Sequence, residues 1–379
     1  MIPFNLPLFT GREKQYTSEV IKKRKFSGDG VFTQKCNLYL ERYLKCKKAL
    51  LTTSGTHALE MAALLIDIKK GDEVIMPSFT FVSTANAFVL QGAKIVFVDI
   101  RPDTMNIDES LIEKAISSKT KAIVVVHYGG ISCEMDQIMR IAKRHKLFVV
   151  EDAAHAIISK YKNKYLGTIG DIGCISFHET KNITCGEGGA VFLNHKSFTE
   201  RAEIIREKGT NRSKFYRGEI DKYTWVDIGS SYLPSEISAA FLYAQLQEVK
   251  KITKYRLALW NLYYKTLKNL EENGFIQLSV IPKGCVHNGH LFYIKTKNLQ
   301  ERSKLISFLK LKGIMAVFHY IPLHSSAAGK LFGCFRGKDV FTTKESEKIL
   351  RLPMFYDLKE PQVKLICRKI IEFYSNEKK

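Results

Sequence analysis

The chain has 379 residues, is 45% hydrophobic and carries a formal net charge of +21. This length and apolar content are ample for a large core with a smaller companion domain. No stretch reaches the roughly 18–20 uninterrupted apolar residues that a membrane span needs, and residues 1–11 lack the pattern of a secretory signal. We therefore expect a folded, two-part cytoplasmic protein.

The charge and the cysteines are both dispersed along the chain. Lysines form only short clusters, such as residues 22–25 and 45–48, and no zinc-finger or RNA-binding signature accompanies them. We interpret most of the charge as a solvated surface and keep a basic nucleic-acid-binding protein as a remote alternative. The eight cysteines form no C-x-x-C pair, so we expect reduced thiols and no metal site.

Between about residues 48 and 200, short apolar runs alternate with amphipathic stretches such as residues 56–68 and 135–146. Runs rich in Val and Ile, separated by helical patterns, are typical of crossover units in a mainly parallel sheet. The predicted strands fall in residues 49–55, 72–79, 93–100, 121–130, 146–154, 174–179 and 188–194. The sequence thus predicts an α/β layer domain, whose ligands gather beyond the carboxyl ends of the strands.

The later part of the chain has a different character. Residues 211–225 are predicted as a long loop, and long loops in compact domains are often functional. Residues 242–270 have a long helical periodicity, after which strands and helices alternate to the end. We expect this helix to connect a large domain at residues 1–249 to a smaller α+β domain at residues 250–379.

Two motifs at predicted strand ends suit a phosphate and a flat ring. Ser54, Gly55 and Thr56 stand between a strand and a helix, where backbone N–H groups and a glycine can cradle a phosphate. An ordinary turn with a helix cap is the alternative. Phe79 and Phe81 follow another strand, where core packing is the simplest interpretation, but a cofactor ring would need such a stacking face.

Charged side chains follow two later strands. Glu151 and Asp152 end an apolar strand, and His155 comes soon after. A desolvated, unpaired carboxylate there would cost several kcal/mol, so it needs an ion pair, a helix cap or a cationic ring nitrogen. The next strand leads to Lys181 and then to Gly-Glu-Gly-Gly at residues 186–189, whose glycines supply bends that would turn the chain away from a bound ring.

The phosphate cradle, the aromatic, the acidic strand end and the lysine together are the parts that a pyridoxal phosphate site requires. A free lysine amine has a pKa near 10.4 and is a poor nucleophile at pH 7. Held as an imine to the cofactor, Lys181 would be released by a substrate amine and would then move a proton as the base. Asp152 would keep the pyridine nitrogen protonated, which makes the ring an electron sink.

Six stretches, in order along nearly the whole chain, resemble the DegT/DnrJ/EryC1/StrS nucleotide-sugar aminotransferases, a family of the aspartate-aminotransferase superfamily (fold type I). They are SGTHAL (54–59), PSFTFVSTANA (77–87), VVEDAAHA (149–156), ISFHETKNITCGEGGAV (175–191), SSYLPSEISAA (230–240) and FHYIPLH (318–324). The resemblance implies a pyridoxal-phosphate-dependent transferase fold with a mainly parallel sheet domain and a smaller α+β domain at the C-terminus.

The resemblance also implies roles for single residues. Lys181 is expected to form the imine and Asp152 to contact the pyridine nitrogen. His155 is expected near the phenolic oxygen of the cofactor, and Phe81 where the family stacks an aromatic on the ring. The residues expected to hold the phosphate are Gly55, Thr56 and Ser176.

Members of this family are homodimers with sites at the subunit interface, so the resemblance implies that the partner subunit completes the Lys181 site. Many members carry an Asn in G-x-N-x-R that reaches the phosphate in the neighbouring subunit. This chain has Ser231 at the position of that Asn and Leu233 at that of the Arg. Because a serine hydroxyl can also bond a phosphate, we retain Ser231 as a predicted cofactor contact.

Within the family, residues 26–34, 176–182, 206–233 and 318–324 are most similar to a branch that serves enterobacterial common antigen biosynthesis. This implies transfer of an amino group from L-glutamate to C4 of dTDP-4-dehydro-6-deoxy-D-glucose, giving dTDP-4-amino-4,6-dideoxy-D-galactose and 2-oxoglutarate. The alternatives are amination at C3, a UDP-sugar substrate, or a dehydratase, in which a histidine replaces the lysine. Lys181 argues against the dehydratase.

The substrate contacts are predicted from two segments. Side chains of the 318–324 stretch are expected either to line the sugar pocket or, equally, to pack between the domains: His319, Tyr320 and His324. Arginine binds both carboxylates and phosphates in a fork, so three arginines beside the predicted loop are candidate clamps for the diphosphate or the glutamate carboxylate. They are Arg206, Arg212 and Arg217, and an ordinary surface position is the simpler interpretation for at least one of them.

Overall fold

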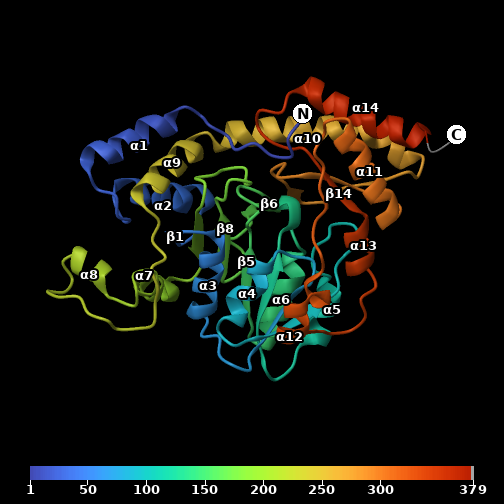
Figure 1. Cartoon of the computed structure of the whole chain (residues 1–379). Helices are drawn as coiled ribbons and strands as arrows, with labels where there is room; N and C mark the ends of the chain where they lie inside the picture. The colour runs from blue at the N-terminus through green and yellow to red at the C-terminus, as the bar shows by residue number, and fades with distance from the viewer. Residues whose placement is uncertain (377–379) are drawn as a thin grey trace.

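The computed structural model describes residues 1–376, with an eight-stranded sheet at its centre (Figure 1). Strand β9 runs antiparallel to both of its neighbours, and every other neighbouring pair in this sheet is parallel. The strands, in order across the sheet, are β1 (Lys48–Thr52), β9 (Gly189–Leu193), β8 (Ile172–Ser176), β5 (Phe148–Asp152), β4 (Thr120–Val126), β2 (Glu73–Pro77), β3 (Lys94–Val98) and β13 (Gly333–Phe335). The predicted α/β domain with a mainly parallel sheet is confirmed.

Both faces of the sheet are buried, which explains the nearly continuous apolar runs. In β4, Ala122 and Val124 pack on one face while Ile123 and Val125 pack on the other, because side chains alternate along a strand. The first face is covered by α3 (Gly55–Leu65), α4 (Val82–Val89) and α7 (Thr199–Arg206). The second face is covered by α5 (Glu109–Ala115), α6 (Met135–His145), α2 (Val31–Leu44) and α9 (Glu236–Gln247). Helix α1 (Arg12–Lys23) lies on α9.

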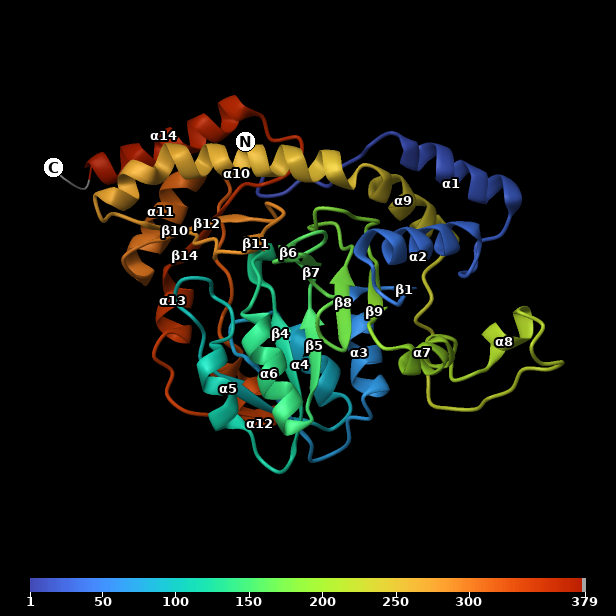
Figure 2. The same cartoon turned by 180° about the vertical axis from the view of Figure 1, so that it is seen from behind.

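The C-terminal part builds a second core. Helices α10 (Val249–Glu272) and α14 (Glu360–Asn376) lie side by side (Figure 2). They pack with α11 (Leu299–Leu311) against an antiparallel sheet of β10 (Gln277–Leu278), β12 (Phe292–Lys295) and β14 (Ile349–Leu352). Ile2 joins this core from the N-terminus. After α12 (Ala327–Phe332), strand β13 returns to the large sheet beside β3, so the predicted second domain contributes one strand to the first.

Shorter elements connect these layers. A small sheet is formed by β11 (Cys285–Val286), β6 (Lys160–Tyr161) and β7 (Lys164–Tyr165). Helix α13 (Thr342–Lys348) precedes β14, and three single 3₁₀ turns are η1 (Tyr128–Gly130), η2 (Lys196–Phe198) and η3 (Leu323–Ser325).

Two segments differ in detail from the sequence prediction. The helical pattern at residues 242–270 is divided between α9 and α10, because Glu248 adopts φ −100° and ψ 5° and interrupts the regular helix. The predicted loop at 211–225 begins with the short helix α8 (Arg212–Tyr216) and projects from the body of the molecule (Figure 1). The predicted division near residue 250 falls at the start of α10 and stays a prediction.

Within residues 1–376, no helix combines the length and the apolar content that crossing a membrane requires.

Candidate active site

A cavity of about 360 Å³ opens where the carboxyl ends of β5 and β8 meet the first turns of α3 and α4. It lies where the parallel-sheet prediction expects ligands, because the loops after parallel strands meet at one edge of the sheet. Most of the predicted site residues line this cavity: Gly55, Thr56, Phe81, Asp152, His155, Ser176, Lys181, His319 and Tyr320.

Two helix starts converge at one end of the cavity. Helix α3 begins at Gly55, after Ser54, whose hydroxyl accepts the backbone N–H of His57 at 3.0 Å. The hydroxyls of Thr56 and Ser83 are 2.8 Å apart and join this turn to the first turn of α4. The first backbone N–H groups of a helix have no partner within the helix, and its dipole favours negative charge. Two such ends with several hydroxyls form a suitable phosphate cradle.

Glycines allow the backbone to close around this cradle. A Cβ built on Gly55 would lie 2.8 Å from the Cβ of Ser176. A Cβ built on Gly189 would lie 2.4 Å from the backbone C and O atoms of Ser54. A larger residue at Gly55 would therefore push α3 away from the end of β8, and one at Gly189 would push it away from the start of β9.

Asp152 and Glu151 are adjacent but serve opposite faces of the sheet, because side chains alternate along β5. The carboxylate of Asp152 lines the cavity, is 6% exposed and accepts hydrogen bonds from the Thr84 hydroxyl at 2.7 Å and from the Ala154 backbone N–H at 3.1 Å. These two donors orient the carboxylate without neutralising it. It is therefore available to pair with a cationic ring nitrogen.

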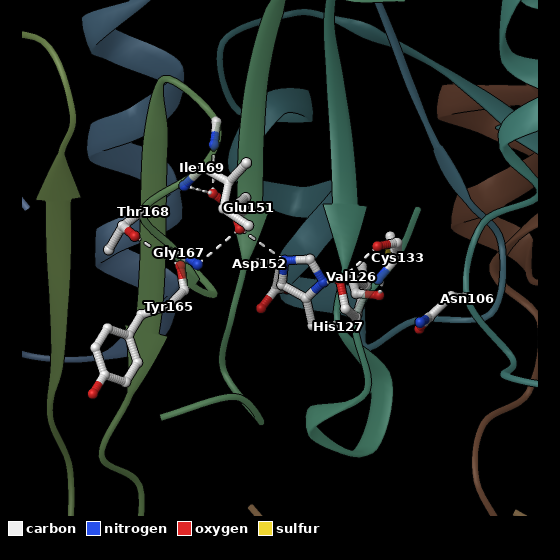
Figure 3. A network of polar contacts seen from close by, with 12 residues as sticks. Asn106, Val126, His127, Cys133, Glu151, Asp152, Tyr165, Gly167, Thr168 and Ile169 are labelled. Carbon is white, nitrogen blue, oxygen red and sulfur yellow. Dashed lines mark hydrogen bonds and ion pairs between the residues drawn. The ribbon is translucent and has the colours of Figure 1, made fainter. Parts of the chain in front are cut away.

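The carboxylate of Glu151 is fully buried. Figure 3 shows it between His127 on one side and Gly167 and Ile169 on the other. It accepts hydrogen bonds from His127 Nε2 at 2.9 Å and from the backbone N–H groups of Gly167, Ile169 and Gly170 at 2.6–2.7 Å. The Cys133 N–H donates to Nδ1 of His127, so the ring proton is on Nε2. This network satisfies Glu151 within the protein and anchors the strand that carries Asp152.

Lys181 follows β8 and points its amine into the same cavity. Its pKa is lowered to about 8, mainly by burial; the charge of Asp152 opposes this shift and that of Arg351 adds to it. The amine makes no hydrogen bond or ion pair with any described residue. Gly186, at φ +82°, turns the chain between Lys181 and β9, as the glycine run predicted. A nucleophilic amine is thus held beside an oriented carboxylate.

Neutral imidazoles line another wall. The rings of His155 and His290 stack with centroids 4.2 Å apart, and those of His155 and His319 are nearly parallel at 6.2 Å. Burial is the main cause that lowers the pKa of all three histidines. The Gly129 N–H donates to His155 Nδ1 at 3.3 Å, which leaves Nε2 of His155 as the proton carrier. His155 can therefore donate a hydrogen bond to an anionic oxygen.

The two phenylalanines have different surroundings. Phe79 is fully buried and packs against Tyr128 and Tyr320, as core packing predicts. Phe81 is 55% exposed at the cavity and precedes the first turn of α4. Its ring centroid is 6.2 Å from that of Tyr320. Of the two phenylalanines, Phe81 is the one that lines the cavity, where it can present a ring face to a flat ligand.

Five predicted contacts lie elsewhere in the single chain. Ser231 and the three arginines line a second cavity of about 730 Å³. There Arg206 is buried and bonds to Asp29 at 2.8 Å. Arg217 pairs with Glu203 and Glu219, and Arg212 donates to the Tyr216 hydroxyl. His324 lines neither cavity; it bonds to Ser78 at 2.7 Å and to Asp339 at 3.2 Å.

Several residues of the site were missed by sequence reasoning. The hydroxyls of Ser83 and Thr84 could have been found, because both residues lie inside the 77–87 motif, in the first turn of α4. His290 and Arg351 come from the C-terminal part of the chain, and no local motif marks them. Only the packing of β14 and of the segment before β12 against the large sheet brings them to the cavity.

The residues present fit pyridoxal phosphate. The helix starts and hydroxyls suit its phosphate, Asp152 suits its ring nitrogen, and the amine of Lys181 has no competing partner among the described residues. All of these groups belong to residues that the structure brings to one cavity.

Comparisons with known proteins agree with this geometry. The model of the DegT/DnrJ/EryC1/StrS aminotransferase family matches residues 8–371. The chain is 34% identical over 377 residues to GDP-perosamine synthase of Escherichia coli O157:H7, covering 99% of both chains. It superposes on DesV of S. venezuelae, solved in complex with a ketimine intermediate, with a TM-score of 0.89, 28% identity and 98% coverage of both chains. The PMP form of Spr1654 from Streptococcus pneumoniae gives a TM-score of 0.89 at 25% identity, covering 99% of this chain and 100% of that one.

The predicted cofactor is confirmed as pyridoxal phosphate and the predicted class as a sugar aminotransferase of fold type I. With a family match over almost its whole length, the chain belongs to the DegT/DnrJ/EryC1/StrS aminotransferase family.

Proposed function

We propose that this enzyme transfers the amino group of L-glutamate to a keto carbon of a nucleotide-linked sugar, with Lys181 as the catalytic base. The observation that carries the proposal is the amine of Lys181, whose pKa burial lowers to about 8, in one cavity with the Asp152 carboxylate and the phosphate cradle. When bound, pyridoxal phosphate supplies the electron sink and the temporary carrier of the amino group.

Different residues of the chain would bind the cofactor's phosphate, hold its ring and move the substrate proton. The first turns of α3 and α4, with Ser176, bind the phosphate. Asp152, oriented by Thr84, favours a protonated ring nitrogen. Phe81 packs on the ring face, and the Nε2–H of His155 donates to the phenolic oxygen. Lys181, partly deprotonated at neutral pH, removes and returns the proton at the substrate carbon.

For the sugar, we propose dTDP-4-dehydro-6-deoxy-D-glucose, aminated at C4 to dTDP-4-amino-4,6-dideoxy-D-galactose. Its support is the similarity of residues 26–34 and 206–233 to the branch of common antigen biosynthesis. A GDP-linked keto sugar is the second candidate, because a relative at 34% identity over the whole chain is a GDP-perosamine synthase. Incubation of the enzyme and glutamate with each nucleotide sugar, followed by mass spectrometry of the amino sugar, separates the two.

We also propose a homodimer in which the second cavity of each subunit completes the partner's site. Ser231 and the three arginines line a cavity other than the Lys181 cavity of their own chain, as a contribution to a partner would require. Apolar side chains of the neighbouring loop are exposed in the single chain: Phe215, Tyr216, Tyr223, Trp225, Val226 and Ile228. Sedimentation velocity gives the subunit number, and a monomer that is fully active would refute the shared site. The cytoplasmic location remains a prediction.

Spectroscopy tests the role of Lys181. The purified enzyme with pyridoxal phosphate should show a yellow absorption band that glutamate bleaches. Lys181→Ala should lack this band, whereas Lys196→Ala, at an exposed lysine outside the cavity, should retain it. A wild-type enzyme without the band, or a Lys181→Ala variant that keeps it, would refute the assignment.

A further inference from the structure

Residues 1–8 form a strap that joins the two cores of the molecule. Ile2 is buried in the C-terminal core, where its N–H donates to the Gly313 carbonyl at 2.7 Å and its carbonyl accepts from the Met315 N–H at 3.0 Å. Leu8 is buried in the core that α2 and α9 form on the large sheet, and its carbonyl accepts from the Gln245 side chain at 2.9 Å. The strap is therefore held at its two ends by different cores.

The middle of the strap lies at the active-site cavity, which Phe4 and Asn5 both line. The carbonyl of Phe4 accepts the Met354 N–H at 3.4 Å, which holds this part against the C-terminal core. Pro3 and Pro7 flank it, and a proline fixes its own φ and favours extended backbone in the residue before it. The side chain of Asn5 is thus presented to the cavity from a restrained segment.

The amide of Asn5 has unused hydrogen-bonding capacity. Its Nδ2 donates to the backbone carbonyl of Glu179 at 3.4 Å, two residues before Lys181. It makes no other hydrogen bond with residues 1–376, so one N–H and the amide oxygen have no protein partner. A hydroxyl can satisfy both groups, because it accepts and donates hydrogen bonds.

The chemistry of the two reactants indicates which of them Asn5 meets. Glutamate and 2-oxoglutarate carry no hydroxyl, and their carboxylates bind most strongly to cationic groups. A nucleotide-linked keto sugar carries neutral hydroxyls on the ring that bears its keto carbon. A neutral amide with one free donor and one free acceptor therefore suits the sugar better than the amino-acid donor.

We propose that Asn5 binds a ring hydroxyl of the nucleotide-linked keto sugar, so that the strap takes part in selecting the acceptor. This inference rests on the proposed aminotransfer to such a sugar and adds a specificity-determining residue to it. A sugar that lacks the hydroxyl would leave the amide unpaired in the closed cavity, which is the physical basis of the discrimination.

Binding of nucleotides that cannot be aminated tests the proposal without catalysis. dTDP and dTDP-D-glucose, which has a hydroxyl in place of the keto group, are titrated calorimetrically into enzyme loaded with pyridoxamine phosphate. The proteins compared are wild type, Asn5→Ala and the matched control Leu6→Ala. Leu6 belongs to the same strap, is 47% exposed and does not line the cavity.

The loss of one hydrogen bond predicts that Asn5→Ala binds dTDP-D-glucose about three- to tenfold more weakly than wild type and binds dTDP equally well. Leu6→Ala should bind both ligands as wild type does. Unchanged affinity of Asn5→Ala for dTDP-D-glucose overturns the proposal. Equal weakening of both ligands also overturns it, because the loss would then come from disorder of the strap. If wild type binds neither ligand, dTDP is the wrong nucleotide, and GDP with GDP-D-mannose gives the same comparison for the second candidate substrate.

The two half-reactions separate the sugar from the donor. In Asn5→Ala, the nucleotide-sugar concentration that half-saturates return of the yellow band should rise about three- to tenfold. The glutamate concentration that half-saturates bleaching should stay within about twofold of wild type. A rise for glutamate alone, or an equal rise for both reactants, overturns the proposal. Failure of the wild type to bleach would instead refute the proposed function, and the calorimetry would still judge Asn5.

Discussion

A methyl group at Gly189 would strike the backbone that forms the phosphate cradle. Gly189 begins β9 opposite Ser176, and an ideal Cβ there lies 2.4 Å from the C and O atoms of Ser54 and 2.5 Å from the N atom of Gly55. Carbon atoms in contact are normally about 3.5–4.0 Å apart. Backbone atoms cannot rotate away, so Gly189→Ala must shift the start of α3 by roughly 1 Å or more.

This displacement should weaken both the fold and the cofactor site. Overpacking of this kind costs about 1–3 kcal/mol of unfolding free energy, and a misplacement of about 1 Å costs on the order of 100-fold in a site that depends on orientation. We therefore expect the dissociation constant of pyridoxal phosphate to rise by one to two orders of magnitude in Gly189→Ala. Titration of the cofactor-free enzyme, followed by absorbance, measures it.

A matched substitution separates the two effects. Gly71 lies in a surface turn at φ +95°, and no atom lies within 4 Å of its ideal Cβ. Gly71→Ala should cost about 1 kcal/mol of stability through the left-handed backbone alone and leave cofactor affinity unchanged. Wild-type affinity and stability in Gly189→Ala would refute the argument from close approach, and equal loss of affinity in both variants would show that affinity merely follows stability.

Three further predictions concern the charged groups. Thr84→Val removes the hydrogen bond to Asp152, so it should lower the unfolding free energy measured in urea by about 1.5–3 kcal/mol and weaken cofactor binding. Unchanged cofactor binding would contradict the role of Thr84 in orienting the carboxylate. In the cofactor-free enzyme, the rate at which Lys181 reacts with an amine-directed reagent should rise about tenfold per pH unit and level off with a midpoint near pH 8. The reason is its lowered pKa, which leaves less of the amine protonated than in an ordinary lysine. Mass spectrometry measures the modified fraction, and a midpoint near pH 10.4 would refute the shift. Glu151→Gln removes the negative charge that accepts hydrogen bonds from His127 and three backbone N–H groups, and it should lower the unfolding free energy by about 3 kcal/mol. A loss below about 1 kcal/mol would show that an amide satisfies these donors equally well.

The sequence alone determined the α/β class, the strands of the large sheet from residue 48 to residue 194, and the central parts of the site. These features are local: a buried parallel strand needs a continuous apolar run, and its carboxyl end carries the residues that meet a ligand. The sequence therefore identified three candidate site residues by their positions after such runs: Lys181, Asp152 and Gly55. Together with the other residues at the strand ends they predicted pyridoxal phosphate, which the comparisons confirmed.

Only the tertiary structure decided which distant segments meet there. Arg351 and His290 reach the cavity because the C-terminal core packs on the large sheet, and no periodicity records such a contact. The same packing separates Ser231 and Arg206 from Lys181, although all three were predicted to belong to the site. It also returns β13 to the large sheet across a predicted domain boundary. Local pattern specifies which face of an element is buried, but the partner of that face depends on the shape and packing of the whole chain.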